Sequence, residues 1–284
     1  MGKVLLTTES VCDIDPGMRE KLDLRIIPYH VILDGKEYLD GVDITTEDIF
    51  RGYRERHILP KTGAINEEEF IAFFTPLVEQ GYEVVHISLG SGISCTYQNA
   101  VLAAARLPGV YPVDSRNLST GLSTILLYAD RMIRAGMTGA QVQAACESLR
   151  MRVHGSFVID TLEFLAAGGR CSSLAALGAN LLRLHPVIEV DTSDGTMHVG
   201  KKYRGSLNRV IPQYFYEFVS RFEDVETEFI FLTHACSSEE EIGLAREAIL
   251  RAHPYKEVYV TCAGTTISTH CGPHCIGCFV VTKE

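Results

Sequence analysis

The stretch that decides the fold runs from residue 82 to residue 105 and reads YEVVHISLGSGISCTYQNAVLAAA. Its apolar, β-branched beginning at residues 84–87 predicts a buried strand. Small residues follow at 88–94. The alanine-rich segment 99–105 lacks Gly and Pro and predicts a helix. Residues 91–96 are therefore expected at a turn where a strand leads into a helix.

This turn has the chemistry of an anion-binding site. The first backbone N–H groups of a helix have no partner within the helix and lie at the positive end of its dipole. Hydroxyl groups of Ser91, Ser94 and Thr96 add further donors. The turn is thus suited to a phosphate or a carboxylate. The alternative is a plain helix cap, because Ser and Thr are common at that position.

Strand and helix patterns alternate through the first half of the chain. Strands are predicted at residues 4–8, 24–32, 84–87 and 110–113, and helices at 67–80, 99–105, 120–134 and 138–151. This order is typical of a mostly parallel sheet with helices on both faces, which is a three-layer α/β domain. Loops that follow such strands meet at one edge of the sheet, where ligands bind.

The second half has a different order of elements. Asp194-Gly195 predicts a hairpin, and the shuffled order of strands and helices indicates an α/β domain with a mixed sheet. Ser172 or Ser173 is expected to cap an apolar helix that ends near Leu182. We therefore expect two domains, residues 1–151 and 152–284. They should pack directly, because no low-complexity linker separates them.

Composition excludes several classes of protein. The 284 residues carry a formal net charge of -10, which argues against nucleic acid or an anionic membrane as the main partner. We find no signal peptide and no apolar run long enough to span a bilayer. The nine cysteines are an odd number and fit free, mostly buried thiols in a reducing cytoplasm.

One alternative function is a small-molecule hydrolase or acyl transferase. Ser94, Asp114 and His270 follow the Ser, Asp, His order of α/β-hydrolases. The nucleophile elbow of those enzymes requires Gly-x-Ser-x-Gly, whereas residues 92–96 read Gly-Ile-Ser-Cys-Thr. Cys95 is a second candidate nucleophile near a helix N-terminus, although most such cysteines are simply packed.

A second alternative is a metal site near the C-terminus. Five candidate ligands lie within nine residues: His270, Cys271, His274, Cys275 and Cys278. A structural zinc usually takes two ligand pairs from separate segments, and this cluster has no distant partner pair. The sequence therefore predicts ordinary thiols, with neither a metal nor a cofactor.

Collinear segments run through nearly the whole chain: Tyr38-Leu39-Asp40-Gly41, Pro60-Lys61-Thr62, residues 91–98, Asp114-Ser115, residues 161–165, Gly168-Gly169-Arg170, His185-Pro186-Val187-Ile188, Asp194-Gly195, Lys201 to Arg204, and His270-Cys271-Gly272-Pro273. Together they resemble the DegV family of bacterial lipid-binding proteins. The resemblance implies two α/β domains with a long-chain fatty acid between them. It also implies a non-enzymatic binding subunit for a separate fatty acid kinase, which phosphorylates the acyl carboxylate with ATP.

The resemblance also implies residue roles. Thr62 and Ser94 would hydrogen-bond the carboxylate with His270 close by, and Ser91, Thr96 and Gly272 would support the loops. Apolar residues of the second half are candidates for the acyl tunnel or for plain core: Leu162, Phe164, Leu165, Leu174, Leu177 and Leu181.

The chain departs from the family pattern at three places. Cys95 replaces the Gly of Ser-Gly-Thr, and Gly63 replaces the Ser of Thr-Ser-Gln-Pro. His274 replaces the last Gly of Gly-Pro-Gly. Each difference could alter the geometry of the head-group site.

A positive surface is the last expected feature. Arg170 follows a break between predicted helices, and Lys202 and Arg204 follow the hairpin. We expect these residues to form a docking patch for an acidic surface of the kinase. The alternatives are a solvated face or an internal ion pair.

Overall fold

The computed structural model describes residues 3–171, 173 and 184–284. The decisive stretch forms β6 (Tyr82–Ser88) and α4 (Thr96–Arg106), with residues 89–95 as the turn between them. This outcome confirms the predicted strand, turn and helix. Among the helices described, none is both long and apolar enough to cross a membrane.

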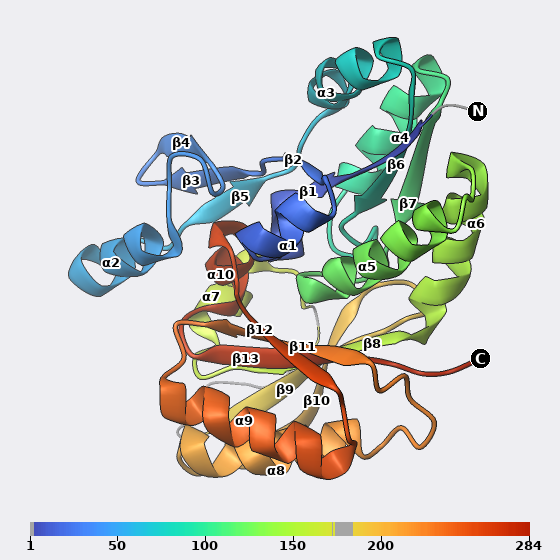
Figure 1. Cartoon of the computed structure of the whole chain (residues 1–284). Coiled ribbons are helices and arrows are strands. Elements are labelled where there is room, and N and C mark those ends of the chain that lie inside the picture. The colour runs from blue at the N-terminus through green and yellow to red at the C-terminus, as the bar shows by residue number, and fades with distance from the viewer. Residues whose placement is uncertain (1–2, 172, 174–183) are drawn as a thin grey trace.

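The N-terminal part is built on a parallel sheet. Its strand order is β2-β1-β6-β7, with β1 at Lys3–Glu9, β2 at Arg25–Ile27 and β7 at Val110–Asp114. Two helix pairs pack on these strands: α3 (Glu67–Glu79) with α4, and α5 (Thr120–Arg134) with α6 (Gly139–Leu149). The three-layer α/β arrangement expected from the sequence is therefore present (Figure 1).

A small antiparallel sheet projects from this part (Figure 1). Its strand order is β4-β3-β5, with bounds Lys36–Leu39, His30–Leu33 and Lys61–Gly63. Helix α2 (Thr46–Arg56) accompanies it, and α1 (Pro16–Lys21) follows the short 3-10 turn η1 (Ser10–Cys12).

The single strand predicted at residues 24–32 is wrong, because β2 and β3 lie in different sheets. The chain changes sheet at Pro28 and Tyr29. Proline has no N–H to donate to a ladder. The Tyr29 backbone bonds outside any ladder, since its N–H donates to Ser10 Oγ at 3.0 Å and its carbonyl accepts from Asp40 N–H at 2.9 Å.

The C-terminal part forms a six-stranded mixed sheet in the described residues, as predicted. The order is β10-β9-β8-β13-β11-β12, in which β11 and β12 are parallel and the other neighbours antiparallel. Their bounds are β8 Val153–Val158, β9 Leu184–Val190, β10 Met197–Arg204, β11 Phe229–Ala235, β12 Glu257–Cys262 and β13 Cys275–Val281. The 3-10 turn η2 (Arg150–Arg152) precedes β8, and the domain boundary at residue 151 stays a prediction.

The two faces of the mixed sheet bury different neighbours. Helices α8 (Leu207–Val219) and α9 (Glu239–Ala252) cover one face, where Val158 joins their core. Phe157, the preceding residue, points to the opposite face and joins the core of the N-terminal part. This alternation is the period of two expected of a strand. The layer between the two large sheets is thus apolar, and α5 crosses it in contact with β8, β11 and β13.

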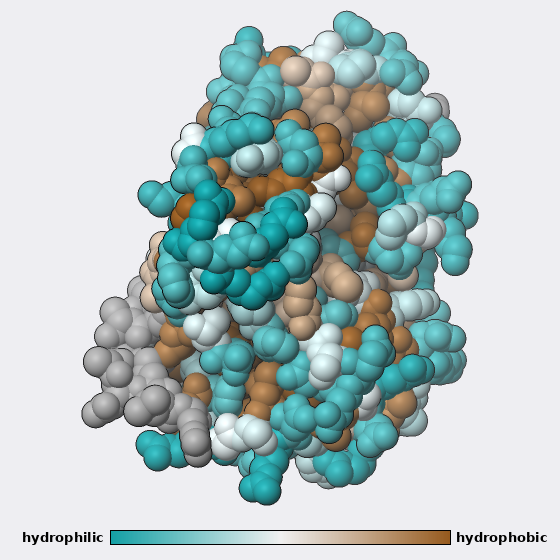
Figure 2. Space-filling model, turned by 90° about the vertical axis from the view of Figure 1, so that its left-hand side faces the viewer, coloured by the Kyte–Doolittle hydropathy of each residue, from teal (hydrophilic) through white to brown (hydrophobic). Residues whose placement is uncertain are grey.

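Two short helices lie beside this layer: α7 (Glu163–Gly168) and α10 (Thr265–Cys271). They pack on one another, and α10 also contacts α2, β3 and β5 of the N-terminal part (Figure 1). On the face drawn in Figure 2 the surface is largely hydrophilic, with hydrophobic residues showing in patches between. The helix predicted to end near Leu182 lies outside the described residues.

Candidate ligand-binding site

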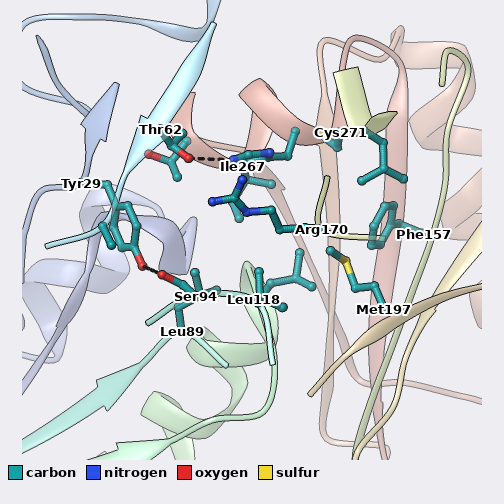
Figure 3. A pocket seen from close by; sticks show the side chains of 15 residues that line it. Tyr29, Thr62, Leu89, Ser94, Leu118, Phe157, Arg170, Met197, Ile267 and Cys271 are labelled. Carbon is teal, nitrogen blue, oxygen red and sulfur yellow. Dashed lines mark hydrogen bonds between the residues drawn. The ribbon is translucent and has the colours of Figure 1, made fainter. Parts of the chain in front are cut away.

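A cavity of ≈ 590 Å³ lies between the two parts of the chain. Its wall combines residues from both parts: Tyr29, Thr62, Ala64, Leu89, Ile93, Ser94, Leu118, Phe157, Leu165, Arg170, Met197, Thr266, Ile267, His270 and Cys271. In Figure 3 the polar side chains Tyr29, Thr62 and Ser94 lie at one end, and Phe157 and Met197 lie at the other. The cavity is therefore amphipathic along its length.

Ser94 is held at the polar end by other hydroxyl groups. Its Oγ lies 2.9 Å from Thr96 Oγ1 and 3.2 Å from Tyr29 OH. Tyr29 OH donates to Thr96 Oγ1 at 2.6 Å. The plain-cap alternative is partly realised, because Thr96 N–H donates to Ser94 Oγ at 3.3 Å. The residue at the cap position of α4 is Cys95, whose side chain makes no cap bond.

Thr62 and His270 form the second polar group. Thr62 lies on β5 and His270 on α10, and their Oγ1 and Nε2 atoms are 2.8 Å apart. Burial, assisted by the positive charge of Arg170, lowers the pKa of His270 to about 4. The imidazole is therefore neutral near pH 7. If Nε2 carries the proton, it donates to Thr62 and leaves the Thr62 proton for a ligand.

Arg170 supplies a positive charge in the same wall. Its guanidinium donates from Nη1 to Gly168 O at 2.6 Å and extends toward Thr62 and Ile267 (Figure 3). Arg170 was expected in a surface patch with Lys202 and Arg204, whereas it lies in the cavity lining. Arg170 is nevertheless exposed overall, so its charge lies where the cavity meets solvent.

Helix α10 is held in place by a carboxylate from the N-terminal part. Asp40 Oδ1 accepts from Thr265 N–H at 3.0 Å, and Asp40 Oδ2 accepts from Thr266 N–H at 3.2 Å. These are helix N–H groups without a partner in the helix, and an acidic side chain suits them. Asp13 accepts in the same way from Gly264 N–H at 2.8 Å. Burial raises the pKa of Asp13 to about 8.

A second, more apolar cavity adjoins the first. It measures ≈ 350 Å³ and shares Leu118, Phe157, Ile267 and Cys271 with the first cavity. The rest of its lining comes from the mixed sheet and its surroundings: Ser119, Thr233, His234, Ala235, Ala263, Cys275, Gly277 and Phe279. The four shared side chains lie between the two cavities, and the second cavity is on the side away from the polar end.

The supporting residues expected from the sequence lie outside this lining. Ser91 bonds Asp114, from its N–H at 3.0 Å and from its Oγ at 2.7 Å, so it anchors the loop to the end of β7. Gly272 has φ 74°, and a Cβ there would come within 2.9 Å of the Phe164 ring. Glycine therefore lets the chain turn directly against α7.

The apolar residues expected in the acyl tunnel or the core also differ in whether they line the cavity. Leu165 lines the cavity, while Phe164 is core that packs edge-on against Phe50 with ring centroids 5.8 Å apart. Leu162 is partly buried against the same core. Leu174, Leu177 and Leu181 lie outside the described residues.

The three residues that depart from the family pattern differ in backbone conformation and in the space around them. Cys95 is exposed with φ -77°, so its side chain needs no glycine geometry. A Cβ at Gly63 would lie 3.3 Å from His30 Cβ, which leaves little room for a side chain. His274 has φ 57°, the left-handed region that favours glycine. It pairs with Glu241 at 3.3 Å.

In the part of the protein that the structure describes, Ser94, His270 and Asp114 are not linked by the hydrogen bonds that a hydrolase triad requires. His270 bonds Thr62 rather than Ser94, and Asp114 accepts from Ser91 and from Arg116 N–H. Residues 3–171, 173 and 184–284 also hold no group of three or more His, Cys, Asp or Glu side chains placed for a metal ion. Cys278 belongs to the core beneath α8 and α9, apart from the Cys271 side.

Lys202 and Arg204 are exposed on β10. Ser173 lies beside this strand, because its Oγ accepts from Val199 N–H at 2.9 Å. A bulge separates Val199 from Lys202 in the pairing with β9. The docking role of these cations stays a prediction.

The cavity wall also contains residues that the sequence did not mark as candidates, among them Tyr29, Leu118, Phe157, Met197, Thr266 and Ile267. Tyr29 lies at an unrecognised change of sheet, and Thr266 and Ile267 lie on an unrecognised helix. The Pro28-Tyr29 pair was a usable signal, because proline breaks a strand ladder.

Comparisons with known proteins point to one family. The family model described as "Uncharacterised protein, DegV family" matches residues 3–283. A DegV domain-containing protein of Clostridium perfringens is 28% identical, with 100% of both chains covered. A fatty-acid-binding DegV family protein from Thermus thermophilus superposes with TM-score 0.87 at 27% identity, covering 99% of this chain and 100% of that one. A stearic-acid-binding protein from Eubacterium ventriosum gives TM-score 0.86 at 25% identity, with 100% and 99% covered.

Proposed function

The chain belongs to the DegV family, and on that premise we propose that it binds a long-chain fatty acid between its two sheets. The observation that carries the proposal is the amphipathic cavity. Hydroxyl groups and one guanidinium gather at one end, and apolar side chains, among them Phe157 and Met197, line the other.

The acyl chain would supply most of the binding free energy. Burial contributes about 0.8 kcal/mol per methylene, so a chain of about 16 carbons offers on the order of 12 kcal/mol before ordering costs. Each hydrogen bond to a charged carboxylate adds about 1.5–3 kcal/mol, less the cost of desolvating the charge. The chain therefore sets affinity, and the polar end sets orientation.

The carboxylate would lie among Thr62, Ser94 and Arg170. Two hydroxyl donors and a guanidinium match a carboxylate, which accepts several bonds at once. His270 would act as a neutral partner that orients Thr62, since its lowered pKa keeps it uncharged near pH 7.

We further propose that the protein is a carrier that presents this carboxylate to a separate fatty acid kinase. The kinase would transfer phosphate from ATP to the acyl group, and the carrier itself would be no enzyme. The exposure of Arg170 supports this, because the head of the ligand would lie near the surface. The cytoplasm is the expected compartment. Nine free thiols, of which six are buried, suit a reducing environment.

The test is denaturing mass spectrometry of an organic extract from the purified native protein, with stoichiometric add-back of fatty acid to delipidated protein. We expect about one fatty acid per chain. A hydrolase would instead turn over an activated ester, and a chain that neither retains nor rebinds acyl lipid would refute the proposal.

A further inference from the structure

Three hydroxyl groups at the polar end of the cavity are linked by a row of hydrogen bonds that ends at Ser94. Tyr29 OH lies 2.6 Å from Thr96 Oγ1, and Thr96 Oγ1 lies 2.9 Å from Ser94 Oγ. Tyr29 OH also lies 3.2 Å from Ser94 Oγ. Tyr29 and Ser94 both line the cavity, whereas Thr96 is fully buried behind them.

The surroundings of the row favour one direction for its protons. Burial, and then the charge of Glu9, raise the pKa of Tyr29 well above its usual range, so the phenol keeps its proton. Its OH lies 2.6 Å from Thr96 Oγ1 and 3.2 Å from Ser94 Oγ, and its single proton is placed on the shorter contact. With Thr96 Oγ1 accepting from Tyr29, the Thr96 proton is directed to Ser94 Oγ.

Ser94 Oγ then has its acceptor capacity filled. It receives the Thr96 hydroxyl and also the Thr96 N–H, which lies 3.3 Å away. A hydroxyl oxygen has two lone pairs and one proton. The Ser94 proton is therefore left to point into the cavity as a donor.

We propose that Tyr29 is a positioning residue that makes Ser94 a dedicated hydrogen-bond donor to an anionic head group. This inference rests on the proposed binding of a fatty acid and assigns to Tyr29 the orientation of the Ser94 proton toward the carboxylate. Hydrogen bonds in such a row polarise one another, so the last donor is strengthened by the first.

The backbone of Tyr29 is placed by the same residue that holds His270. Asp40 N–H donates to Tyr29 O at 2.9 Å, and the Asp40 carboxylate holds the first N–H groups of α10. The hydroxyl row and the Thr62–His270 pair thus share one anchor.

The test compares two ligands that differ only in their head group. Delipidated wild type and Tyr29→Phe are titrated with hexadecanoic acid and with hexadecan-1-ol by calorimetry. The hydroxyl group of the alcohol can either donate or accept a hydrogen bond, so the affinity for the alcohol does not depend on the direction of the Ser94 proton. We expect Tyr29→Phe to bind the acid about tenfold more weakly, the worth of one good hydrogen bond. Affinity for the alcohol should change less than about twofold.

Tyr38→Phe is the matched control, because Tyr38 lies on β4 of the small sheet, outside the cavity lining, with its ring centroid 4.5 Å from Lys36 Nζ. It should change neither affinity. A second pair of variants tests the middle of the row without altering Tyr29. Thr96→Ser keeps a hydroxyl and should bind the acid like wild type, whereas Thr96→Val should resemble Tyr29→Phe.

The inference is overturned if Tyr29→Phe weakens acid and alcohol equally, which is the pattern of a purely structural role. It is also overturned if the acid binds Tyr29→Phe with wild-type affinity. If Tyr29→Phe does not fold, equal acid affinities of Thr96→Ser and Thr96→Val overturn it. Wild type that binds neither ligand would instead refute the proposed function, and this inference with it.

Discussion

Thr62 and His270 are 208 residues apart in the chain, yet Thr62 Oγ1 lies 2.8 Å from His270 Nε2. The contact joins β5 of the N-terminal part to α10 of the C-terminal part. Gly168 makes it sterically feasible, because a Cβ there would lie 2.3 Å from His270 Nδ1. The polar end of the cavity therefore exists only when three separate segments are assembled.

The first prediction separates ligand retention from ligand presentation. Ser94→Ala and Thr62→Val should lower kinase-dependent acyl phosphate formation by at least tenfold while the purified proteins still retain fatty acid. The reason is that the buried chain holds the ligand and the hydroxyls orient its head. Phosphorylation assays and lipid mass spectrometry on the same preparations measure both quantities.

Ser91→Ala is the control for that comparison, since it removes a hydroxyl from the same loop whose partner is Asp114. It should leave phosphorylation close to wild type. Folded Ser94→Ala and Thr62→Val proteins that contain no lipid would contradict the proposed division of roles.

The second prediction concerns stability and pH in the delipidated protein. The pKa of His270 is lowered from 6.5 to about 4, so between these values the unfolded chain binds a proton that the folded chain does not. Stability from the neutral imidazole is therefore complete above pH 6.5 and is lost as the pH falls toward 4. The loss amounts to about 3 kcal/mol at most.

Denaturant unfolding of wild type and His270→Asn across this pH range measures the effect. Burial also lowers the pKa values of His154 and His234, but both proteins contain them, so the difference isolates His270. Wild type should lose more stability than His270→Asn on acidification. Parallel curves would show that His270 titrates normally.

The sequence predicted the fold best where local signals and the fold agree. The strand and helix around Ser94 have matching propensities, and they form as β6 and α4. The mixed sheet followed from the Asp194-Gly195 turn and the order of elements. These features depend on residues that are close together in the chain, so the sequence pattern is enough to predict them.

Helix α10 could not be predicted in this way. Its sequence, Thr-Thr-Ile-Ser-Thr-His-Cys, is rich in β-branched residues with weak helix propensity. The helix is held instead by Asp40, which lies 225 residues before Thr265. The position of Arg170 in the cavity wall could not be predicted either, because it also depends on contacts between segments that are distant in the chain.

The third prediction tests the second, more apolar cavity. Ala235 is 1% exposed and lines the second cavity, so Ala235→Leu should fill part of it. An acid of about 16 carbons would then lose the burial of several methylenes, each worth about 0.8 kcal/mol, and bind more than tenfold more weakly. A 10-carbon acid, which need not reach this region, serves as the internal control.

Calorimetric titration of both acids into delipidated protein gives the comparison. Equal losses for the long and short acids would indicate a general disturbance of the fold. Unchanged affinity for the long acid would place the end of the chain elsewhere.

The last prediction distinguishes two roles for the cations expected on one surface. Arg170 lines the cavity, while Lys202 and Arg204 are exposed on β10. Arg170→Gln should weaken fatty acid binding about tenfold, because a charge-assisted partner of the carboxylate is lost. It should also raise the pKa of His270 toward its usual value, since Arg170 contributes to the lowering of that pKa.

Lys202→Ala with Arg204→Ala should leave lipid affinity unchanged. The double variant should associate more slowly with the kinase, and the salt dependence of that association should be weaker. Titration calorimetry, NMR of the His270 ring and association kinetics at several salt concentrations separate these outcomes. A double variant with wild-type association rates and salt dependence would remove Lys202 and Arg204 from the docking surface. Wild-type lipid affinity in Arg170→Gln would remove Arg170 from the carboxylate site.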